Sequence, residues 1–344
     1  MDALLDKLRQ GDRRSLARAM SLVDGQDAQA EALTDRLRRS TGQVPWWGFT
    51  GPPGVGKSTL IDALLTILRQ RGRRIGVVAV DPTSPMSDGA LLGDRVRMMR
   101  HAVDRDVFIR SLATHHREGG LSDATIHCAR ILEVGGFDPV LIETVGVGQN
   151  EVDIASVADL SVVILGPGYG DDIQLIKAGL LEVADLVVVN KCDLPEANRL
   201  LKEVHAEFGG MPQAYPAQSS DPETADGGVP SPQPRAKSPV IVGIEAKSGI
   251  GVDDLLDRLL ECDAAARTPE QRECHRRRRV LGEIRRSAMH RYELALDRAL
   301  SAPDAADLVN RLETGAVSLE SVIAALSEAA LRFDFSPPAP RIRS

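Results

Sequence analysis

The residues best suited to chemistry form a glycine-rich stretch, residues 51–58, with the sequence GPPGVGKS. It matches the pattern GxxxxGK[ST] and lies between the apolar run WWGFT and the helical pattern STLIDALLTILRQ. Glycines in such a loop let backbone N–H groups curl around phosphate oxygens, whereas the bland reading is a glycine-rich turn without a ligand. Because strand, loop and helix are in register, we predict a nucleoside triphosphate site with Lys57 on the β and γ phosphates and Ser58 on Mg²⁺. The predicted loop comprises Gly51, Pro52, Pro53, Gly54, Val55, Gly56, Lys57, Ser58 and Thr59.

Acidic residues that end two apolar runs are candidates for the metal and the attacking water. Asp81 follows the run IGVVAV, and Glu143 closes VLIE just before Thr-Val-Gly at 144–146. Open α/β sheets bind ligands at these strand ends. The second segment resembles the DxxG element of GTPases with Glu in place of Asp, so we expect Gly146 to offer its N–H to the γ-phosphate and Glu143 to hold Mg²⁺ through water. Either acid alone could instead be an N-cap or an exposed strand end.

Residues 81–95 form an irregular segment punctuated by Pro and Gly, with the acid and base Asp94 and Arg95 at its end. This composition suits a switch that γ-phosphate and Mg²⁺ order and that hydrolysis releases. Asp94 and Arg95 could instead form an ordinary surface pair worth ~0–1 kcal/mol.

The tetrapeptide NKCD at 190–193 predicts which base is bound. A carboxylate at Asp193 can accept hydrogen bonds from guanine N1–H and its exocyclic amine, and a site built on such donors rejects an analogue without them by ~10⁴ to 10⁵. Lys191 can lay its alkyl stem over the ring, and Asn190 can brace the phosphate loop. A later loop, Glu245-Ala246-Lys247, resembles the SAK loop that offers a backbone N–H to guanine, with Glu245 in place of a small hydroxyl residue. GTP is therefore favoured over ATP.

The pattern of apolar runs predicts the fold that positions these residues. Runs at 46–50, 75–80, 107–110, 140–144, 160–165, 186–190 and 240–244 are apolar on both faces, as parallel strands covered by helices require. Helical patterns lie between them at 58–70, 122–134, 173–181, 197–208 and 252–263. We predict an α/β fold of the P-loop NTPase type, with a doubly wound, mostly parallel sheet and helical extensions at both ends.

Composition shifts along the chain predict three zones. Residues 1–44 read as a helical extension of two amphipathic helices interrupted by Gly11, and residues 45–266 as the nucleotide-binding domain. Within that domain, residues 211–239 are rich in Pro, Ser, Gly and Ala and predict a mobile loop. Residues 267–344 read as helices with a Pro-rich tail.

Bulk composition excludes several classes of partner. With 42 Lys and Arg against 49 Asp and Glu, the net charge of −7 disfavours polyanions. No run approaches the ~18 apolar residues of a membrane span, so we expect neither nucleic acid nor a membrane as partner. The four cysteines form no CxxC pair, and with no apolar signal-peptide core at the start they favour the cytoplasm. The run CHRRRR at 274–279 cannot complete a zinc site and is typical of a solvated helix face or a partner patch.

Several long ordered motifs resemble one family, the methylmalonyl-CoA mutase-associated GTPases. They are VDPTSPMSDGALLGDRVRM, FIRSLATHHREGGLS, GFDPVLIETVGVGQNEVDIA and GPGYGDDIQLIKAGLLEVADLVVVNKCD, and the resemblance runs from about residue 40 to 210. It implies a homodimeric GTPase with a C-terminal dimerisation arm at 267–344 that acts as a chaperone of an adenosylcobalamin-dependent acyl-CoA mutase and gates its cofactor loading and protection. It also implies that Asp81, Asp94 and Glu143 supply carboxylates near Mg²⁺ and the γ-phosphate.

The chain departs from the family pattern in three places, namely Asp88 where glycine is expected, Glu245 in the guanine loop, and the insertion at 211–239. Two rival functions stay open. A P-loop small-molecule kinase would need an acceptor pocket and a base, and NKCD argues against ATP. A metal-insertion GTPase would be expected to carry a His-rich tract or a CxxC site, and this sequence has neither.

Overall fold

The computed structural model describes residues 1–25, 28–81, 98–113, 121–144, 150–168, 184–208 and 239–331. These fall into two compact units, Met1–Arg279 and a second unit that begins at Val280. Several predicted features lie outside the described residues: Asp88, Asp94, Arg95, Gly146, the helix at 173–181 and nearly all of the loop at 211–239.

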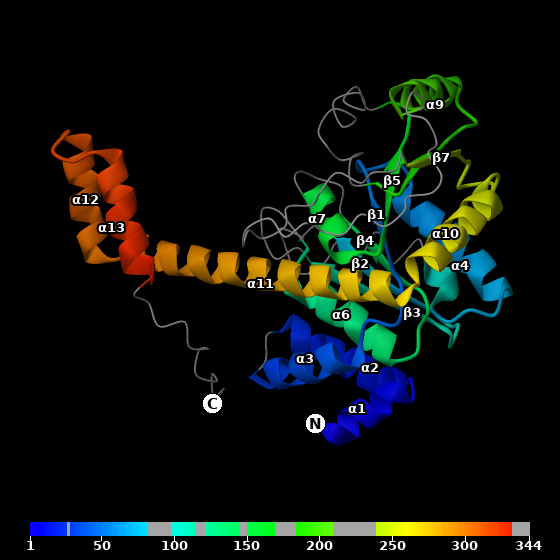
Figure 1. Ribbon diagram of the computed structural model, residues 1–344, viewed down its shortest axis with the longest axis horizontal. Coiled ribbons are helices and arrows are strands. Elements are labelled where there is room, and N and C mark those ends of the chain that lie inside the picture. Colours follow the sequence, from blue (N-terminus) through cyan, green and yellow to red (C-terminus); the bar gives the residue numbers. More distant parts are fainter. Residues whose placement is uncertain are drawn as a thin grey trace. The chain divides into compact units, whose positions relative to one another are not determined.

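A seven-stranded sheet forms the centre of the first unit, with the order β3-β2-β4-β1-β5-β6-β7 (Figure 1). Every pairing between neighbouring strands is parallel. The strands are β1 (Trp46–Thr50), β2 (Ile75–Asp81), β3 (Val107–Ala113), β4 (Val140–Glu143), β5 (Leu160–Leu165), β6 (Leu186–Val189) and β7 (Val240–Gly243). All seven were predicted, and the order reverses direction at β1, so the doubly wound α/β prediction is confirmed.

Helices cover both faces of the sheet, and side chains alternate between two cores because successive strand residues point to opposite faces. One core joins Trp47 and Phe49 of β1 to α4 (Lys57–Gln70) and α10 (Val252–Ala266). On the other face, α6 (Asp123–Val134), α7 (Asn150–Val157) and α9 (Pro195–Phe208) pack on the strands. The sequence pattern predicted α4, α6, α9 and α10, whereas α7 was not predicted.

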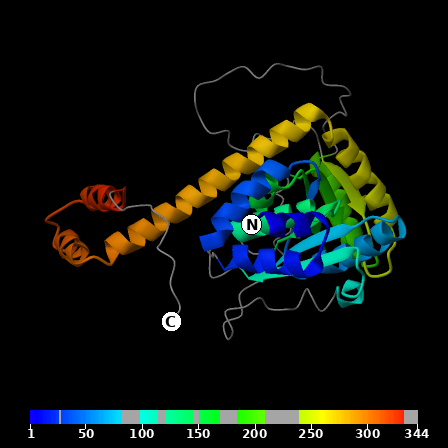
Figure 2. The ribbon, with the colours of Figure 1, turned by 90° about the horizontal axis from the view of Figure 1, so that it is seen from below.

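The first 40 residues form three helices, α1 (Asp2–Arg9), α2 (Arg13–Asp24) and α3 (Ala28–Ser40), where two were predicted. Gly11, with φ +70°, makes the predicted break between α1 and α2. The apolar residues Leu8, Leu16 and Leu37 are fully buried and join the core that contains α6. Figure 2 shows these helices in front of the sheet, and they belong to the first compact unit.

Helices α11 (Pro269–Leu300), α12 (Pro303–Glu313) and α13 (Leu319–Leu331) confirm the predicted helical character of the C-terminal zone. Helix α11 begins within the first unit and continues beyond Arg279. Inside the second unit, the Tyr292 hydroxyl donates a hydrogen bond to Ser327 Oγ at 3.0 Å, which joins α11 to α13. None of the helices in the described part of the chain has the length and apolar character needed to cross a bilayer.

Candidate functional site

The phosphate loop connects β1 to α4 and has a backbone that only glycine adopts without strain. Gly51, Gly54 and Gly56 have φ values of +140°, +77° and +100°, in the region that L side chains rarely enter. A Cβ at Gly51 would lie 2.1 Å from the carbonyl oxygen of Ile164 on β5. Gly56 is the N-cap of α4 and has no side chain to bond the first-turn amides, which leaves a positive helix end suited to an anion.

Lys57 lies inside this loop and is 7% exposed. Its Nζ donates hydrogen bonds to the carbonyl oxygens of Gly51 at 2.8 Å and Pro52 at 2.9 Å. The loop's own carbonyls thus hold the ammonium group at the position where β and γ phosphates would arrive, and phosphate oxygens could replace them as acceptors.

Of the three oxygen-bearing side chains predicted for the metal, Ser58 lies in the first turn of α4, and Asp81 and Glu143 end β2 and β4. The Ser58 hydroxyl donates to Glu143 Oε1 at 2.8 Å, and both residues are almost fully buried. Glu143 is paired in register with Phe49 of β1 and Ala79 of β2, and the 2% exposed Asp81 ends β2. A hydroxyl with one or two carboxylates is a donor set that fits Mg²⁺, which keeps its other positions for phosphate oxygens and water.

Asn190 links the two halves of the predicted nucleotide site. Its Nδ2 donates to the carbonyl oxygen of Val55 at 2.8 Å, and its Oδ1 accepts the backbone N–H of Ala246 at 3.0 Å. A Cβ at Gly56 would lie 2.4 Å from Asn190 Nδ2, so the glycine is needed for this close approach. The expected brace on the phosphate loop is therefore present, and one side chain fixes the distance between the phosphate loop and the guanine loop.

A backbone hydrogen bond joins the two predicted guanine segments, and another closes a turn within the second one. Cys192 N donates to Ile244 O at 3.0 Å, and Glu245 N donates to Ile250 O at 2.9 Å, which closes a tight turn at 245–250. Within this turn, the backbone N–H of Ala246 donates to Asn190 Oδ1, so Ala246 helps to hold the turn against the other guanine segment. Lys191 adopts φ +63°, while Asp193 and Lys247 are exposed at the open side of the loops. This arrangement leaves the Asp193 carboxylate accessible to a base.

Sequence reasoning missed two contacts near these groups. Thr144 Oγ1 donates to Thr50 Oγ1 at 2.9 Å, which ties the residue after Glu143 to the residue before the phosphate loop. On α4, the Asp62 carboxylate accepts a bond from Arg100 Nε at 2.8 Å and lies 3.2 Å from His101 Nε2. The position of Thr144 directly after Glu143 could have indicated its contact with Thr50. Nothing near Asp62 in the sequence indicated its contacts with Arg100 and His101.

The prediction of a solvated helix face for the run at 274–279 is wrong for its last two residues. Arg276 and Arg277 are exposed, but Arg279 is 6% exposed and Arg278 is partly buried. Both inner guanidinium groups find carbonyl acceptors at the end of α7. Arg278 and Arg279 therefore pack against the first unit, whereas Arg276 and Arg277 face solvent.

The sequence of this chain matches a family model and several known proteins. The family model described as methylmalonyl Co-A mutase-associated GTPase MeaB matches residues 16–301. A putative GTPase of Pyrococcus horikoshii is 51% identical over 193 residues, which is 56% of this chain and 61% of that protein. The mitochondrial methylmalonic aciduria type A homolog of Mus musculus is 34% identical over 278 residues, covering 76% of this chain and 62% of that protein.

One solved structure shares the fold over nearly the full length. The crystal structure of LAO/AO transport system kinase superposes with a TM-score of 0.67 at 24% identity, covering 95% of this chain and 96% of that one. The matches to the first curated relatives span about three-fifths of those proteins' length. The family model covers most of the present sequence, so this chain belongs to the methylmalonyl-CoA mutase-associated GTPase MeaB family.

Proposed function

We propose that this chain is a Mg²⁺-dependent GTPase that acts as a chaperone of an adenosylcobalamin-dependent acyl-CoA mutase. The proposal of nucleotide binding rests on the two hydrogen bonds of the Asn190 side chain. Its Nδ2 donates to Val55 O, and its Oδ1 accepts the N–H of Ala246. It joins a phosphate-binding loop to the two segments that would surround a base, at a fixed separation. A phosphate site alone would not need this connection.

The phosphate chemistry rests on charge stabilisation by groups already in place. Lys57 and the amides at the start of α4 would hold the β and γ phosphates. Ser58, Asp81 and Glu143 would hold Mg²⁺, which neutralises charge on the phosphate oxygens when bound. Asp94 and Gly146, outside the described residues, complete the proposed set around the metal and the γ-phosphate.

Base selection rests on Asp193, Lys191 and the turn at 245–250. The exposed carboxylate of Asp193 would accept the two guanine donors. Adenine lacks that pair of donors, so an acceptor covered by the base would be left unsatisfied in an ATP complex. We therefore propose GTP and GDP as the ligands.

The mutase partner is supported by names carried by relatives. The matching family is described as mutase-associated, and the mouse relative is named for methylmalonic aciduria. In the described part of the phosphate loop, Lys57 is the cation that could stabilise charge on the γ-phosphate. We expect slow intrinsic hydrolysis that accelerates when the mutase orders the segments around the γ-phosphate. Adenosylcobalamin would be bound by the mutase.

A second copy of the chain is the proposed partner of the C-terminal helices. The described part of these helices exposes many large apolar side chains. An exposed apolar surface of this kind is typical of a protein–protein interface. The exposed side chains are Ile284, Met289, Leu294, Leu300, Val309, Leu319, Ile323 and Leu331. The proposed setting is the cytoplasm, whose reducing conditions suit four cysteines that form no disulfide.

The test is GTP hydrolysis by the pure protein with and without each candidate acyl-CoA mutase. We expect slow release of free phosphate from GTP, little from ATP, and stimulation by one mutase that also co-purifies with the chain. Label transferred from GTP to a small-molecule acceptor would contradict hydrolysis. Stimulation and co-purification by none of the mutases would contradict the chaperone role while leaving the GTPase intact.

A further inference from the structure

Two threonines pair at the carboxyl ends of β1 and β4, close in the chain to the proposed phosphate and metal ligands. Thr50 is the last residue of β1, and Thr144 directly follows Glu143, the last residue of β4. The Thr144 hydroxyl donates a hydrogen bond to Thr50 Oγ1 at 2.9 Å, and both residues are buried. Because a buried hydroxyl that loses its partner is costly, this bond constrains the two chains at the point where their strands end.

The threonine pair continues the alignment of β1 with β4 by one position. The strand register places Phe49 beside Glu143. The backbone N–H of Thr144 then donates to Phe49 O at 3.1 Å, and the hydroxyl bond joins Thr144 to Thr50. A backbone bond and a side-chain bond therefore both act on the residue that directly follows Glu143.

The separation of β1 and β4 at this point affects the distance between two proposed ligands of Mg²⁺. Ser58 lies on the chain that continues from β1 through the phosphate loop into α4, whereas Glu143 ends β4. Ser58 Oγ lies 2.8 Å from Glu143 Oε1. Mg²⁺ demands near-ideal octahedral geometry, and the groups of a functional site must be held to within about 0.5 Å. A small change in the β1–β4 spacing should therefore weaken the binding of the ion.

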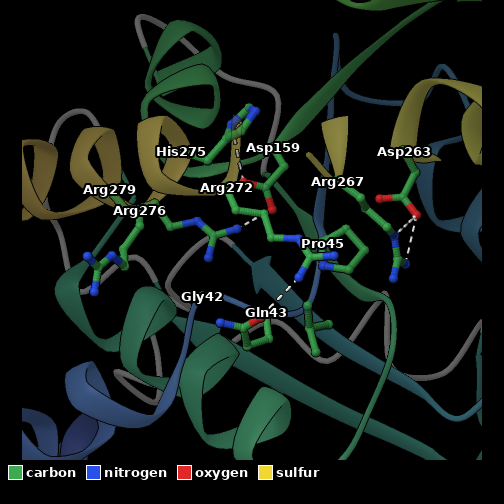
Figure 3. Close-up of a pocket in the computed structure, with 11 residues that line it drawn as sticks. Gly42, Gln43, Pro45, Asp159, Asp263, Arg267, Arg272, His275, Arg276 and Arg279 are labelled. Carbon is green, nitrogen blue, oxygen red and sulfur yellow. Dashed lines mark hydrogen bonds and ion pairs between the residues drawn. The ribbon is translucent and has the colours of Figure 1, made fainter. Parts of the chain in front are cut away.

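The amino end of β1 is fixed independently of the threonines. Asp159 Oδ2 accepts the backbone N–H of Trp46 at 2.7 Å, and the Arg279 guanidinium lies 3.9 Å from the centre of the Trp46 ring. Figure 3 shows Arg272 of α11 reaching Gln43, just before β1, at 3.0 Å. With this end of the strand held by side chains of α11 and by Asp159, loss of the threonine bond should act on the carboxyl end alone.

We propose that Thr144, through its bond to Thr50, is a positioning residue for the Mg²⁺ site. The bond holds the Glu143 carboxylate at the distance from the Ser58 hydroxyl that the ion requires. Because the two threonine hydroxyls bind each other, they act through Glu143 and Ser58. This proposal rests on the proposed binding of Mg²⁺ and GTP, and it adds the residues that set the geometry of the metal ligands.

The test is calorimetric titration of the full-length protein with GMPPNP, a non-hydrolysable GTP analogue, over a series of free Mg²⁺ concentrations that begins in EDTA. In the wild type we expect Mg²⁺ to tighten binding. Thr144→Val, which lacks the hydroxyl, should raise the Mg²⁺ concentration for half-maximal tightening roughly fivefold, the effect of one lost hydrogen bond. In EDTA its affinity for GMPPNP should stay within about twofold of the wild type, because no proposed phosphate contact is removed. Thr144→Ser keeps the hydroxyl and should restore the wild-type Mg²⁺ dependence.

Two further variants separate the threonine bond from a general loss of packing. Thr50→Val removes the same bond from the other side and should give the same shift. The double variant Thr50→Val/Thr144→Val should shift no further than either single variant, because both changes remove one interaction. Thr34→Val is the matched control, since it deletes another buried threonine hydroxyl, which donates to Glu31 O at 2.9 Å on α3. It should titrate like the wild type.

Three results would overturn the positioning role. They are a folded Thr144→Val protein with the wild-type Mg²⁺ dependence, a Thr144→Ser protein as impaired as Thr144→Val, and a double variant whose shift is the product of the single shifts. Tryptophan fluorescence in urea shows which variants fold, and if Thr144→Val does not fold, a wild-type Mg²⁺ dependence of Thr50→Val would overturn the role instead. A wild type that binds no guanine nucleotide, or binds it without Mg²⁺ dependence, would refute the proposed function itself.

Discussion

The two edges of the parallel sheet are built in different ways. At the carboxyl edge, the proposed nucleotide site is built around the glycine backbone of a short loop, where Lys57 binds carbonyls five and six residues away. At the amino edge, charged side chains from distant parts of the chain form a dense network. Arg279 reaches the carbonyl of Val157, 122 residues away, and Arg69 pairs with Asp104 and Asp106.

This difference suggests that the carboxyl edge serves ligand binding, whereas the amino edge holds the helices onto the sheet. At the carboxyl edge, the backbone amides and the charged side chains Lys57, Asp81 and Glu143 lie where a nucleotide and its metal would bind, so that ligand would balance their charge. Guanidinium–carboxylate pairs at the amino edge satisfy one another and hold the helices onto the sheet. Changes at the carboxyl edge should therefore alter nucleotide chemistry with little effect on stability, and changes at the amino edge should do the reverse.

The largest effect should come from Asp193→Ala at the carboxyl edge. Removing the acceptor for the two guanine donors should reduce the preference for GTP over ATP by roughly 10³-fold or more. Calorimetric titration of both nucleotides measures this ratio, and urea unfolding should be unchanged because Asp193 is exposed. Glu196→Ala is the control, since Glu196 is exposed three residues later on α9. A GTP preference that survives in Asp193→Ala would assign base recognition to other residues.

Lys57→Ala should come next. The ammonium group now held by Gly51 O and Pro52 O would be absent from the β and γ phosphates, and kcat for GTP hydrolysis should fall by about 10² to 10³. Free phosphate release at saturating GTP measures the loss. Lys202→Ala, which changes an exposed lysine on α9, should hydrolyse GTP like the wild type. Equal rates in Lys57→Ala and wild type would remove the phosphate loop from the mechanism.

The sequence predicted those features of the two edges that depend on residues close together in the chain, and it mostly missed those that depend on distant residues. The strands and the phosphate loop were predicted because apolar runs and glycine spacing are local. The role of Asn190 was predicted because a short motif defines it, although its partner Val55 lies 135 positions away. Helix α7 was missed because its eight residues, NEVDIASV, carry no clear helical stripe. Arg279 was misjudged because its burial depends on Val157 and Asp159, which no local pattern connects to it.

Arg279→Met tests the amino edge with a smaller effect. The methionine can fill space beside Trp46, but the Val157 carbonyl and the Asp159 carboxylate lose a donor. A buried acceptor left unsatisfied costs about 1 to 3 kcal/mol, so the free energy of unfolding should fall by about 2 kcal/mol. Fluorescence of the chain's two tryptophans, both in the first unit, follows this transition in urea. Arg277→Met should change it by less than about 0.5 kcal/mol. A stability equal to the wild type would show that the network adds nothing net.

The smallest effect should be the pH dependence of the pair between Arg69 and Asp104, at the same edge. The hydrogen bond from Arg69 Nε, at 2.7 Å, lowers the pKa of the Asp104 carboxyl in the folded state, and the backbone N–H of Asp106 lowers it further. A carboxyl whose pKa is lowered by folding stabilises the protein fully above its unfolded pKa, about 3.9, and loses this contribution as the pH falls through the folded value. Asp104→Asn should therefore lower the free energy of unfolding at pH 7 by up to about 1 kcal/mol, because the pair is partly exposed to solvent. The difference from the wild type, followed by tryptophan fluorescence in urea, should shrink below about pH 4. Glu207→Gln, an exposed change on α9, should show no such trend, and a gap for Asp104→Asn that stays constant with pH would show that its effect comes from packing and not from charge.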